Sequence, residues 1–504
     1  MLETCEIRTS AQMRAIESRM IGSGAVSGVL LMERAGKRVV EAILAQWPDL
    51  VSSGDRSALV LCGSGNNGGD GFVIARLLSA MGWRVEVLLA DDPTKLRPDA
   101  RLNHDRWRAI GGVFNDPTRI SRRADLAVDA LLGIGLDRPI DPLAPFIAAL
   151  RTASHLVAVD IPSGLCADSG RVISRSCTPA AADLTVTFHC KKPGHLLGQG
   201  PLLCGHVVVA DIGLPQAPSH LRQVIGADLA KRQGHKFDHG HALIIAGGRW
   251  KGGAARLSAR SALRIGAGLV TICPPADALA EHAGPPDALM RHPLDDASDL
   301  AATLRDDRIS AICIGPGCGV DRAAALLPVV LRSGRPAVLD GDAITALSQR
   351  RLPFQDLHPA CILTPHAGEF ARLFPDVAEQ LKEPVLKGPA CSRIDAASEA
   401  AARSSAVVLL KGPDTVIADP SGRVLVHSAA DLPWLATAGA GDVLAGLIVG
   451  LLARGFATPD AAAAAVLAHA TAARNFGPGL IADDLPEAVP AALRVLQARL
   501  PSRA

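Results

Sequence analysis

Residues 58 to 71 read Ala58-Leu-Val-Leu-Cys-Gly-Ser-Gly-Asn-Asn-Gly-Gly-Asp-Gly71, and they set the organisation of the first half of the chain. A short apolar run typical of a buried strand leads into a glycine-rich loop, and a segment with helical periodicity follows. Glycine lets backbone N–H groups turn toward an anion because no Cβ stands in the way. A helix that starts after such a loop adds the positive end of its dipole. The stretch therefore predicts an α/β layer with a phosphate-binding turn.

A second glycine-rich turn lies in the other half, at Leu435-Ala-Thr-Ala-Gly-Ala-Gly-Asp-Val-Leu-Ala-Gly446. Its small residues lead directly into an apolar helix, so we predict that the N–H groups of residues 439–441 form an anion hole. The two turns have different sequence contexts, and we find no repeat that relates the two halves. They therefore indicate two different phosphate-handling units and not a duplication.

The length of 504 residues exceeds one ordinary core and predicts two domains. Apolar runs bounded by turn residues alternate with helical periodicity in both halves, which is typical of α/β layers. The pattern lapses into proline, histidine and mixed charge over residues 215–239, so we place the boundary near residue 222 and predict domains 1–222 and 223–504. An amphipathic segment, 10–44, is expected to pack outside the first sheet, and 461–473 is expected to form an alanine-rich helix.

The predicted strands follow from these apolar runs. In the first half they are Ala58–Leu61, Val85–Leu89, Leu126–Val128, Leu156–Val159, Leu184–Thr187 and Val207–Ala210. In the second half they are Ala242–Ala246, Leu269–Ile272, Ile309–Ile314, Ala337–Leu339, Cys361–Leu363, Val407–Leu410 and Thr415–Ala418.

Charge and cysteine content narrow the class of protein. Lys plus Arg number 52 against 50 for Asp plus Glu, without a long run of either sign, so nothing in the charge pattern indicates nucleic acid or an anionic membrane as partner. The 11 cysteines stand singly, without a C-x-x-C pair, which indicates reduced thiols and argues against a zinc site. We read no signal peptide at the start, and the apolar stretch 435–453 contains Asp442 and four glycines, which suits a buried helix and not a bilayer span. We expect a cytoplasmic enzyme that acts on small molecules.

Two alternatives compete for the first glycine loop. Gly63-Ser-Gly-Asn-Asn-Gly68 formally satisfies the G-x-G-x-x-G pattern of dinucleotide oxidoreductases, with Asp91 or Asp92 as the ribose-binding acid. The two asparagines and Asp70 weaken that interpretation, because they crowd the loop with polar side chains and put a carboxylate where a pyrophosphate should rest. The other alternative is that Asp70 only caps a helix that begins at Gly71.

Further polar residues follow two later strands. Asp129 lies at the end of the strand predicted at residues 126–128, and Val159-Asp-Ile-Pro-Ser-Gly164 repeats the arrangement with Asp160 and Ser163. An open parallel sheet binds its ligands at the carboxyl ends of its strands. Each residue alone would form a turn, but carboxylates that converge on one crevice need a cation or a proton-transfer role. Together they favour a site.

These motifs resemble those of the NAD(P)H-hydrate epimerases. The resemblance runs over Leu31-Met-Glu-Arg-Ala-Gly36, Asn66-Asn-Gly-Gly-Asp70, Val128-Asp-Ala-Leu-Leu-Gly133, Val159-Asp-Ile-Pro-Ser-Gly164 and Thr187-Phe-His-Cys-Lys-Lys-Pro-Gly194. It implies that the hydrated nucleotide is bound by two loops, which consist of Asn66, Asn67, Gly68, Gly69 and Asp70 and of Gly133, Ile134, Gly135, Leu136, Asp137, Arg138 and Pro139.

The same resemblance implies the chemistry of the first half. A K⁺ ion would be held by Asn67, Asp129 and Ser163. Asp160 would contact the nucleotide and be the principal acid–base group, with Lys191 as a helper, although Lys192 is adjacent and either lysine could be a solvated charge at a strand end. The 6-hydroxyl of a hydrated nicotinamide is a hemiaminal-like group, so inversion of that carbon requires proton transfer by a group with a tuned pKa.

The turn of the second half resembles the Gly-Ala-Gly-Asp loop of ribokinase-like kinases, in which Asp442 would deprotonate a hydroxyl that attacks a terminal phosphate. An ordinary helix entry with an aspartate cap is the alternative. Five further motifs narrow the resemblance to the ADP- or ATP-dependent NAD(P)H-hydrate dehydratases. They are Gly247-Gly-Arg-Trp-Lys-Gly-Gly-Ala-Ala255, Gly266-Ala-Gly-Leu-Val270, Gly315-Pro-Gly-Cys-Gly319, Leu363-Thr-Pro-His-Ala-Gly-Glu369 and Leu410-Lys-Gly-Pro-Asp-Thr415.

The resemblance implies two sets of ligand residues here. The hydrated nucleotide would face Ala254, Gly317, His366 and Asp442. The adenine nucleotide would be held by Lys411, Gly412, Pro413, Asp414, Thr415 and Gly441, with Mg²⁺ bridging its phosphates. His366 alone could be a strand-end histidine, and Trp434 stands where the family has a small turn, which leaves the choice between ADP and ATP open.

The expected fold is therefore α/β, with a Rossmann-like doubly wound αβα domain followed by a ribokinase-like αβα domain. The expected function is repair of hydrated NADH and NADPH. The first domain would interconvert the R and S epimers, and the second would dehydrate the S epimer while ADP or ATP loses a phosphate. A vitamin or sugar kinase fused to a nucleotide-binding domain is the main alternative, and a binding protein with inactive sites is another. We expect a homo-oligomer.

Overall fold

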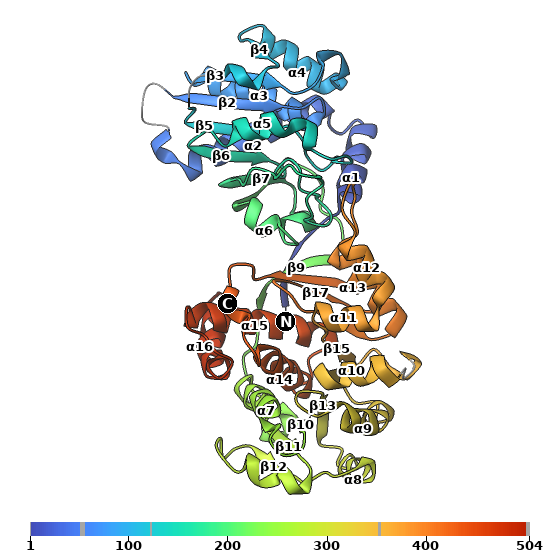
Figure 1. Ribbon diagram of the computed structural model, residues 1–504. Helices are drawn as coiled ribbons and strands as arrows, with labels where there is room; N and C mark the ends of the chain where they lie inside the picture. Colours follow the sequence, from blue (N-terminus) through green and yellow to red (C-terminus); the bar gives the residue numbers. More distant parts are fainter. Residues whose placement is uncertain (1, 51–55, 121–122, 351–353, 500–504) are drawn as a thin grey trace. The chain divides into compact units, whose positions relative to one another are not determined.

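The computed structural model describes residues 2–50, 56–120, 123–350 and 354–499 (Figure 1). Contacts divide the chain into two units, which are described separately. The N-terminal unit consists of Glu6–Ser219 and Glu383–Ser392, and the C-terminal unit consists of Met1–Cys5, His220–Lys382 and Arg393–Ala504. The predicted division into 1–222 and 223–504 differs from this one because each unit takes in a short segment from the other half of the chain.

The N-terminal unit is built on a sheet of seven strands in the order β4-β3-β2-β5-β6-β7-β8, with every neighbouring pair parallel. The order reverses between β2 and β5, so the crevice for a ligand is expected at the carboxyl ends of these two strands. The strands are β2 (Ser57–Cys62), β3 (Arg84–Leu89), β4 (Val113–Phe114), β5 (Leu126–Ala130), β6 (His155–Val159), β7 (Leu184–Phe188) and β8 (His206–Ala210).

Helices cover both faces of this sheet, because its central strands are apolar on both sides. Val60 of β2 belongs to one core, with Val39 of α2 and Phe72 of α3. The next residue, Leu61, belongs to the core on the other face, with Ile147 of α5. The helices are α1 (Ser10–Gly22), α2 (Gly28–Gln46), α3 (Asn66–Ala80), α4 (Pro98–Arg108), α5 (Ala144–Leu150) and α6 (Gly200–Leu203). This layering confirms the predicted doubly wound α/β class.

The C-terminal unit contains a sheet in which eleven strands are described, in the order β1-β9-β18-β17-β16-β15-β14-β13-β10-β11-β12. Its centre is parallel, and the β16-β17-β18 meander is antiparallel. The strands are β1 (Leu2–Glu6), β9 (Leu221–Ala227), β10 (His241–Ile245), β11 (Leu269–Cys273), β12 (Met290–Arg291), β13 (Ile309–Ile314), β14 (Ala337–Leu339), β15 (Cys361–Leu363), β16 (Val407–Leu410), β17 (Asp414–Ala418) and β18 (Val424–Ser428).

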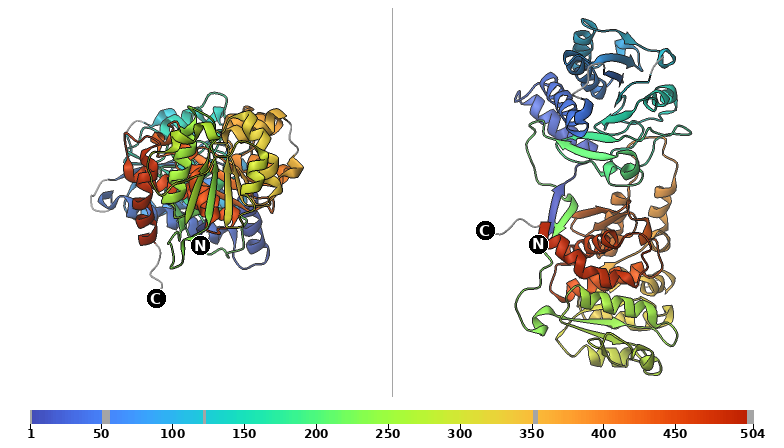
Figure 2. Two further views of the ribbon diagram at one scale, coloured as in Figure 1. Left: turned by 90° about the horizontal axis from the view of Figure 1, so that it is seen from below. Right: turned by 90° about the vertical axis from the view of Figure 1, so that its left-hand side faces the viewer.

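Helices again cover both faces, as the views in Figures 1 and 2 show. One layer contains α7 (Gly252–Arg264), α14 (Ala440–Ala453), α15 (Thr458–Phe476) and α16 (Asp484–Arg499). The other contains α8 (Ala297–Thr303), α9 (Val320–Arg332), α10 (Gly341–Arg350), α11 (Ala367–Leu373), α12 (Pro375–Lys382) and α13 (Arg393–Ser404). The predicted helix at residues 461–473 is confirmed, since it lies within α15.

Close packing against α7 explains the small residues of α14. A Cβ on Gly446 would lie 2.1 Å from the carbonyl oxygen of Ser258, and one on Gly450 would lie 2.4 Å from the side chain of Ile265. Glycine at both positions therefore lets the two helices approach backbone to backbone. Across the described ranges, no helix is long and apolar enough to cross a membrane.

The sequence patterns missed several strands of the C-terminal sheet, namely the edge strands β1 and β12 and the strands β9 and β18, which follow β1 in the sheet order. Residues 221–227 lie in the stretch that was predicted to be irregular, yet they form β9 and pair with β18. The opening strand β1 belongs to the same sheet and not to the N-terminal unit, because the Arg222 guanidinium donates to Thr4 Oγ1 over 2.6 Å and the Cys5 thiol donates to Gln223 Oε1. Pairing between strands so far apart in sequence leaves no local pattern.

Candidate active sites

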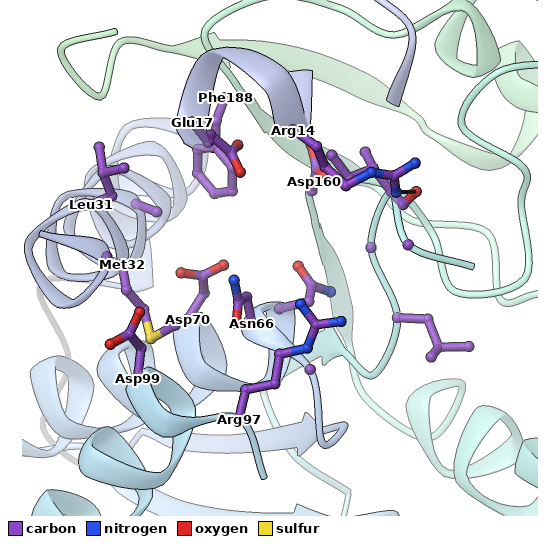
Figure 3. A pocket seen from close by; sticks show the side chains of 18 of the residues that line it. Arg14, Glu17, Leu31, Met32, Asn66, Asp70, Arg97, Asp99, Asp160 and Phe188 are labelled. Carbon is purple, nitrogen blue, oxygen red and sulfur yellow. Dashed lines mark hydrogen bonds between the residues drawn. The ribbon is translucent and has the colours of Figure 1, made fainter. Parts of the chain in front are cut away.

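A cavity of about 520 Å³ opens over the carboxyl ends of β2 and β5, at the switch point of the N-terminal sheet (Figure 3). Gly63, the residue after β2, packs against the segment that follows β5, since a Cβ on Gly63 would lie 1.9 Å from the Leu131 carbonyl oxygen. The helix α3 then begins at Asn66, with Gly65 as its N-cap and no capping side chain among the described residues. Its first N–H groups are therefore available to an anion in the cavity.

Asp70 lies inside α3 and not at its start, so the alternative that it caps a helix beginning at Gly71 is wrong. The Asn66-Asn-Gly-Gly-Asp70 run forms the first turns of the helix, and Gly69 N donates to the carbonyl oxygen of the N-cap Gly65. Asp70 is 9% exposed and lines the cavity. Burial raises its pKa well above the usual range, and the charges of Asp160 and Glu17 add to this effect.

Asp160 lies at the end of β6 in the left-handed region, with a φ of 66°. Its Oδ1 accepts hydrogen bonds from Lys192 Nζ over 2.7 Å and from Thr187 Oγ1 over 2.8 Å. Burial works to raise the pKa of Asp160, but the charge and hydrogen bond of Lys192 outweigh it, so the pKa is lowered. Asp160 is thus a buried carboxylate held in its ionised form.

The structure pairs Lys192 with Asp160, and not Lys191, which was predicted as the helper. Lys191 forms a backbone bridge with Ile7, and its carbonyl oxygen accepts from Arg8 N. Successive side chains of an extended segment point to opposite sides. Lys192, which is 1% exposed, is therefore the lysine that enters the site.

A buried histidine, His195, stabilises the backbone of the same site. His195 Nδ1 accepts from the backbone N–H of Lys192 over 2.9 Å, so the proton lies on Nε2 and is donated to the Asp160 carbonyl oxygen over 2.8 Å. Burial and the charge of Lys192 lower the pKa of His195 to about 4. His195 is thus neutral and holds the backbone of both charged partners.

The predicted potassium ligands are brought together beside this site. Ser163 Oγ donates to Asp129 Oδ1 over 2.6 Å, and Ser163 N donates to Asp129 Oδ2 over 2.8 Å. Burial raises the pKa of Asp129 although the hydrogen bonds from Ser163 oppose it. Asn67 lies against Gly133, whose Cβ would be 3.2 Å from Asn67 Oδ1, and the buried Asn67 Nδ2 finds no partner among the described residues.

The second predicted nucleotide loop is only partly at the cavity. Gly133, Ile134 and Gly135 line it, whereas residues 136–139 do not. Leu136 is buried in the core on the α5 face instead, and the Asp137 carbonyl oxygen accepts from Gly388 N. Sequence reasoning also missed four charged residues that line the cavity from other helices, namely Arg14, Glu17, Arg97 and Asp99. They lie outside the recognised motifs.

The candidate site of the C-terminal unit lies where α14 begins. Gly439 is its N-cap with a φ of 89°, and Asp442 lies in its first turn. Burial and the charge of Asp340 raise the pKa of Asp442 to about 6, although the charge of Lys411 opposes them. A Cβ on Gly441 would lie 3.4 Å from Lys411 Nζ, so the structure brings Gly441, Asp442 and Lys411 together as predicted.

Lys411 is held by residues that the prediction did not assign. Its Nζ lies 2.8 Å from Asp340 Oδ1, which also accepts from Thr364 Oγ1, and 3.9 Å from Glu369 Oε2. Burial works to lower the pKa of Lys411, but the charge and hydrogen bond of Asp340 act with the charges of Glu369 and Asp442, and together they raise the pKa. The signal was present in the sequence, because Asp340 and Thr364 directly follow the strands β14 and β15.

Two other predicted ligand residues of the C-terminal unit, Gly317 and His366, have different local environments. Gly317 has a φ of 61° and approaches Ala254, whose Cβ would be 3.2 Å from a Cβ on Gly317. His366 is the N-cap of α11, with Nδ1 accepting from Gly368 N over 2.9 Å. Its predicted contact with the hydrated nucleotide stays a prediction.

The turn after Lys411 has bonds of its own. Asp414 is buried against Arg393 over 3.1 Å, and Thr415 Oγ1 donates to the Gly412 carbonyl oxygen over 2.8 Å. Both side chains, which open β17, thus stabilise the turn of residues 411–413 between β16 and β17. A role for these residues in binding adenine nucleotide stays a prediction.

Comparison with known proteins covers both units. Residues 242–488 match the family model described as NAD(P)H-hydrate dehydratase, and residues 29–194 match the model described as YjeF-related protein N-terminus. The chain is 35% identical over 534 residues to the bifunctional NAD(P)H-hydrate repair enzyme Nnr of Moorella thermoacetica, covering 97% of each chain. It is 35% identical to the enzyme of the same name from Coxiella burnetii, covering 94% of this chain and 96% of that one.

A separate relative matches the N-terminal half alone. The NAD(P)H-hydrate epimerase of Rhodobacter capsulatus is 50% identical over 194 residues, which are 38% of this chain and 91% of that one. Identity of this level over the full length of two-domain relatives covers both sites described above. The chain therefore belongs to the family of bifunctional NAD(P)H-hydrate repair enzymes.

Proposed function

We propose that the N-terminal unit interconverts the R and S epimers of hydrated NADH and NADPH, and that the C-terminal unit dehydrates the S epimer while ADP or ATP loses its terminal phosphate. The observation that carries the proposal is a separate acid–base site in each unit, Asp160 with Lys192 in one and Asp442 with Lys411 in the other. The family to which the chain belongs supports both activities.

In the N-terminal unit, the α3 N-terminus and the loop at Gly133 would bind the nucleotide phosphates, since both line the cavity. Carbon C6 of the hydrated nicotinamide carries a hydroxyl and is bonded to the ring nitrogen. Inversion at this carbon requires proton transfer to and from oxygen, and Asp160 is the ionised carboxylate in position to accept a proton.

The residues present fit a potassium ion. Asn67, Asp129 and Ser163 offer amide, carboxylate and hydroxyl oxygens, which are the donors that hard cations prefer. The buried Asp129 carboxylate has hydrogen bonds but no cationic side chain among its described partners, and Asn67 Nδ2 is unpartnered. A bound K⁺ would supply positive charge for Asp129 and for the nucleotide phosphates. Asn67, which follows β2, and Ser163, which follows β6, would contact this ion near the carboxyl ends of the two strands.

In the C-terminal unit, Asp442 would act as the base. With a pKa of about 6 it is ionised at neutral pH and can take the proton of the 6-hydroxyl as that oxygen attacks the terminal phosphorus. The N–H groups at the start of α14 and the Lys411 ammonium would stabilise charge on the transferred group. The C6–O bond of the new phosphate ester then breaks, and phosphate leaves with the electron pair. The ring nitrogen shares the positive charge on C6, and loss of a C5 proton restores the dihydropyridine.

The charged residues of this site also fit Mg²⁺. Asp340, Asp342, Glu369 and Asp442 supply carboxylate oxygens there, and their charges all act on Asp442 or Lys411. Mg²⁺ commonly takes one or two carboxylates together with substrate phosphates. When bound with ADP or ATP it would neutralise the donor phosphates. Asp342 has a positioning role besides, because its Oδ2 accepts from Gly319 N over 2.8 Å.

The test uses the full chain, a mixture of R and S hydrated NADH, ADP and Mg²⁺. We expect a fast rise in dihydronicotinamide absorbance for the S epimer and a slower rise for the R epimer. Asp442→Asn should remove both phases, and Asp160→Asn should remove only the second beyond the spontaneous rate. A stable phosphorylated product without recovered absorbance would refute the proposal and indicate the small-molecule kinase.

Two further expectations belong to this proposal. We expect the enzyme to act in the cytoplasm, where NADH and NADPH are substrates of metabolism, and to form a homo-oligomer. Light scattering on the purified full chain would measure its mass in solution. A mass of 52.2 kDa would be that of a monomer and would contradict the oligomer.

A further inference from the structure

A second carboxylate enters the epimerase cavity from α1. This helix is capped by Thr9, whose side chain accepts from Gln12 N, and Ser10 is tied to Asp168 by hydrogen bonds of 2.6 Å from N and 2.5 Å from Oγ. Met13 and Ile16 are buried in the core. Glu17, one residue after Ile16, is therefore held at the rim between core and cavity.

Figure 3 shows Glu17 and Asp70 pointing into the cavity from different walls, with Asp160 at a third place on its lining. Glu17 comes from α1, Asp70 from α3 and Asp160 from the end of β6. Glu17 belongs to no motif of the sequence, and no described ion pair involves it. It is a partly buried carboxylate without an assigned purpose in the fold.

Glu17 interacts electrostatically with charged groups on several other elements, and one of them is Asp70 of α3, whose pKa is raised by burial and by the charges of Asp160 and Glu17. Burial raises the pKa of Glu17, the charge of Asp160 raises it further, and Lys192 and Arg14 oppose the rise. For Asp160 the balance is the reverse, since burial is opposed by the charge and hydrogen bond of Lys192 together with His195 and Thr187, and the pKa is lowered. One cavity thus holds a carboxyl that retains its proton to higher pH beside a carboxyl that loses it early.

Inversion of C6 through departure of its oxygen needs two proton transfers at two places. The departing hydroxyl must receive a proton on one face of the ring, and the water that attacks must lose a proton on the opposite face. A single fixed carboxyl reaches one face only. Inverting glycosidases solve the same problem with one protonated and one ionised carboxyl on opposite sides of the reacting carbon.

We propose that Glu17 is the second acid–base residue of the epimerase site, working with Asp160 on opposite faces of C6. The proposal rests on the epimerase function proposed above. In one direction Glu17 gives its proton to the 6-hydroxyl, the C6–O bond breaks with its electron pair on the departing water, and the positive charge is shared by C6 and the ring nitrogen. A second water attacks the other face and gives a proton to Asp160.

The step balances, because one proton leaves the enzyme and one arrives, and one water departs for each that is added. After one turnover Glu17 is ionised and Asp160 is protonated, so the reverse reaction starts from that form with the roles exchanged. The enzyme therefore alternates between two protonation forms, one for each epimer. The oxygen on C6 of the product comes from the solvent.

The test compares the intact full chain with Glu17→Gln, Glu17→Asp and a matched control, Glu41→Gln, which removes an exposed carboxyl on α2 outside the cavity. The substrate is purified R hydrated NADH with ADP and Mg²⁺, so that epimerisation limits the return of absorbance. Dehydration of the S epimer by the same samples serves as the internal control. Mass spectrometry of the S epimer formed in ¹⁸O-labelled water without ADP measures exchange at C6.

We expect Glu17→Gln to lower kcat for the R epimer by at least about 100-fold with a much smaller change in KM. Glu17→Asp should recover part of the rate, and the pH profile of the intact enzyme should lose its alkaline limb in Glu17→Gln. One labelled oxygen should enter per inversion. A Glu17→Gln variant within threefold of the intact rate, or inversion without label, would overturn the proposal. An intact enzyme that dehydrates the S epimer but never converts R to S would overturn the epimerase function and this inference with it.

Discussion

Replacement of Lys192 by methionine should destabilise the N-terminal unit by about 3–5 kcal/mol. Methionine keeps most of the buried volume but removes the charge and three donated bonds, of 2.7 Å to Asp160 Oδ1, 2.7 Å to Thr187 Oγ1 and 3.1 Å to the Phe188 carbonyl oxygen. The loss leaves the Asp160 carboxylate buried without its ion-pair partner, which is the larger part of the cost. Adding Asp160→Asn should therefore recover part of the stability.

The pH dependence of stability should change sign in the same variant. In the intact protein, burial raises the pKa of Asp160, but the charge and hydrogen bond of Lys192, with contributions from His195 and Thr187, lower it overall. Such a group contributes stability that is present above the unfolded-state pKa and is lost as the pH falls through the folded-state pKa. Without Lys192, burial alone raises the folded pKa, so stability is full below the unfolded pKa, about 3.9, and falls as the pH rises through the folded value.

Tryptophan fluorescence during urea unfolding is the suitable assay. Trp83 and Trp107 are buried in the N-terminal unit, whereas Trp250 and Trp434 of the C-terminal unit are 86% and 49% exposed. The emission shift on unfolding therefore reports mainly the N-terminal unit. Because a chain with two compact units does not satisfy the two-state approximation as a whole, the free energy is taken from the transition that tryptophan fluorescence reports.

Measurements at pH 5 and pH 8 compare the intact chain with Lys192→Met and with the matched control Lys191→Met. The control should lie within about 0.5 kcal/mol of the intact chain, because Lys191 does not contact Asp160. A loss below about 1 kcal/mol for Lys192→Met, with an unchanged slope against pH, would refute the assignment of Lys192 as the partner that keeps Asp160 ionised.

Three further predictions concern other parts of the molecule. Because Asp442 must be ionised to act as a base, the dehydration rate should rise with pH through about 6, and Asp442→Asn should lower it by at least about 100-fold while R-to-S conversion continues; a flat pH profile would contradict this role. Gly446→Ala should cost about 1–3 kcal/mol or more, since its Cβ would lie 2.1 Å from the Ser258 carbonyl oxygen, and calorimetry that finds an unchanged melting temperature would disprove this packing. Asp129→Asn should abolish the response of epimerisation to K⁺ when Na⁺ is exchanged for it, and a variant that still responds would place the ion elsewhere.

Features with a local signal were predictable from sequence. The strand, glycine loop and helix at residues 57–80 are consecutive, so their apolar periodicity and small residues are sufficient to predict all three. The same holds for the turn into α14, where Asp442 lies at the predicted helix start. Motifs of this kind locate a site because the carboxyl ends of parallel strands meet at one edge of the sheet.

Features that depend on distant partners were not predictable. The choice between Lys191 and Lys192 is decided by the backbone bridge to Ile7, and a shift of one residue in an extended segment moves a side chain to the opposite face. The strand β1 is bonded to a partner 218 residues away. Glu17 lies on a helix whose sequence shows an apolar stripe and ordinary charges, and only the cavity distinguishes it from a solvated residue.

The division of the chain into units has a consequence for any attempt to separate the two activities. The chain passes between the units four times, because Met1–Cys5 and Glu383–Ser392 each belong to the unit opposite to their sequence neighbours. A gene cut near residue 222 would leave β9 as an uncovered sheet edge, which is a template for association with other chains. It would also strip Val385 and Ala390 from the core beside Leu136. Division of this protein into two active enzymes therefore requires redesign of the surface that each separated unit would expose. A permuted chain that keeps each short segment with its own unit would avoid this redesign.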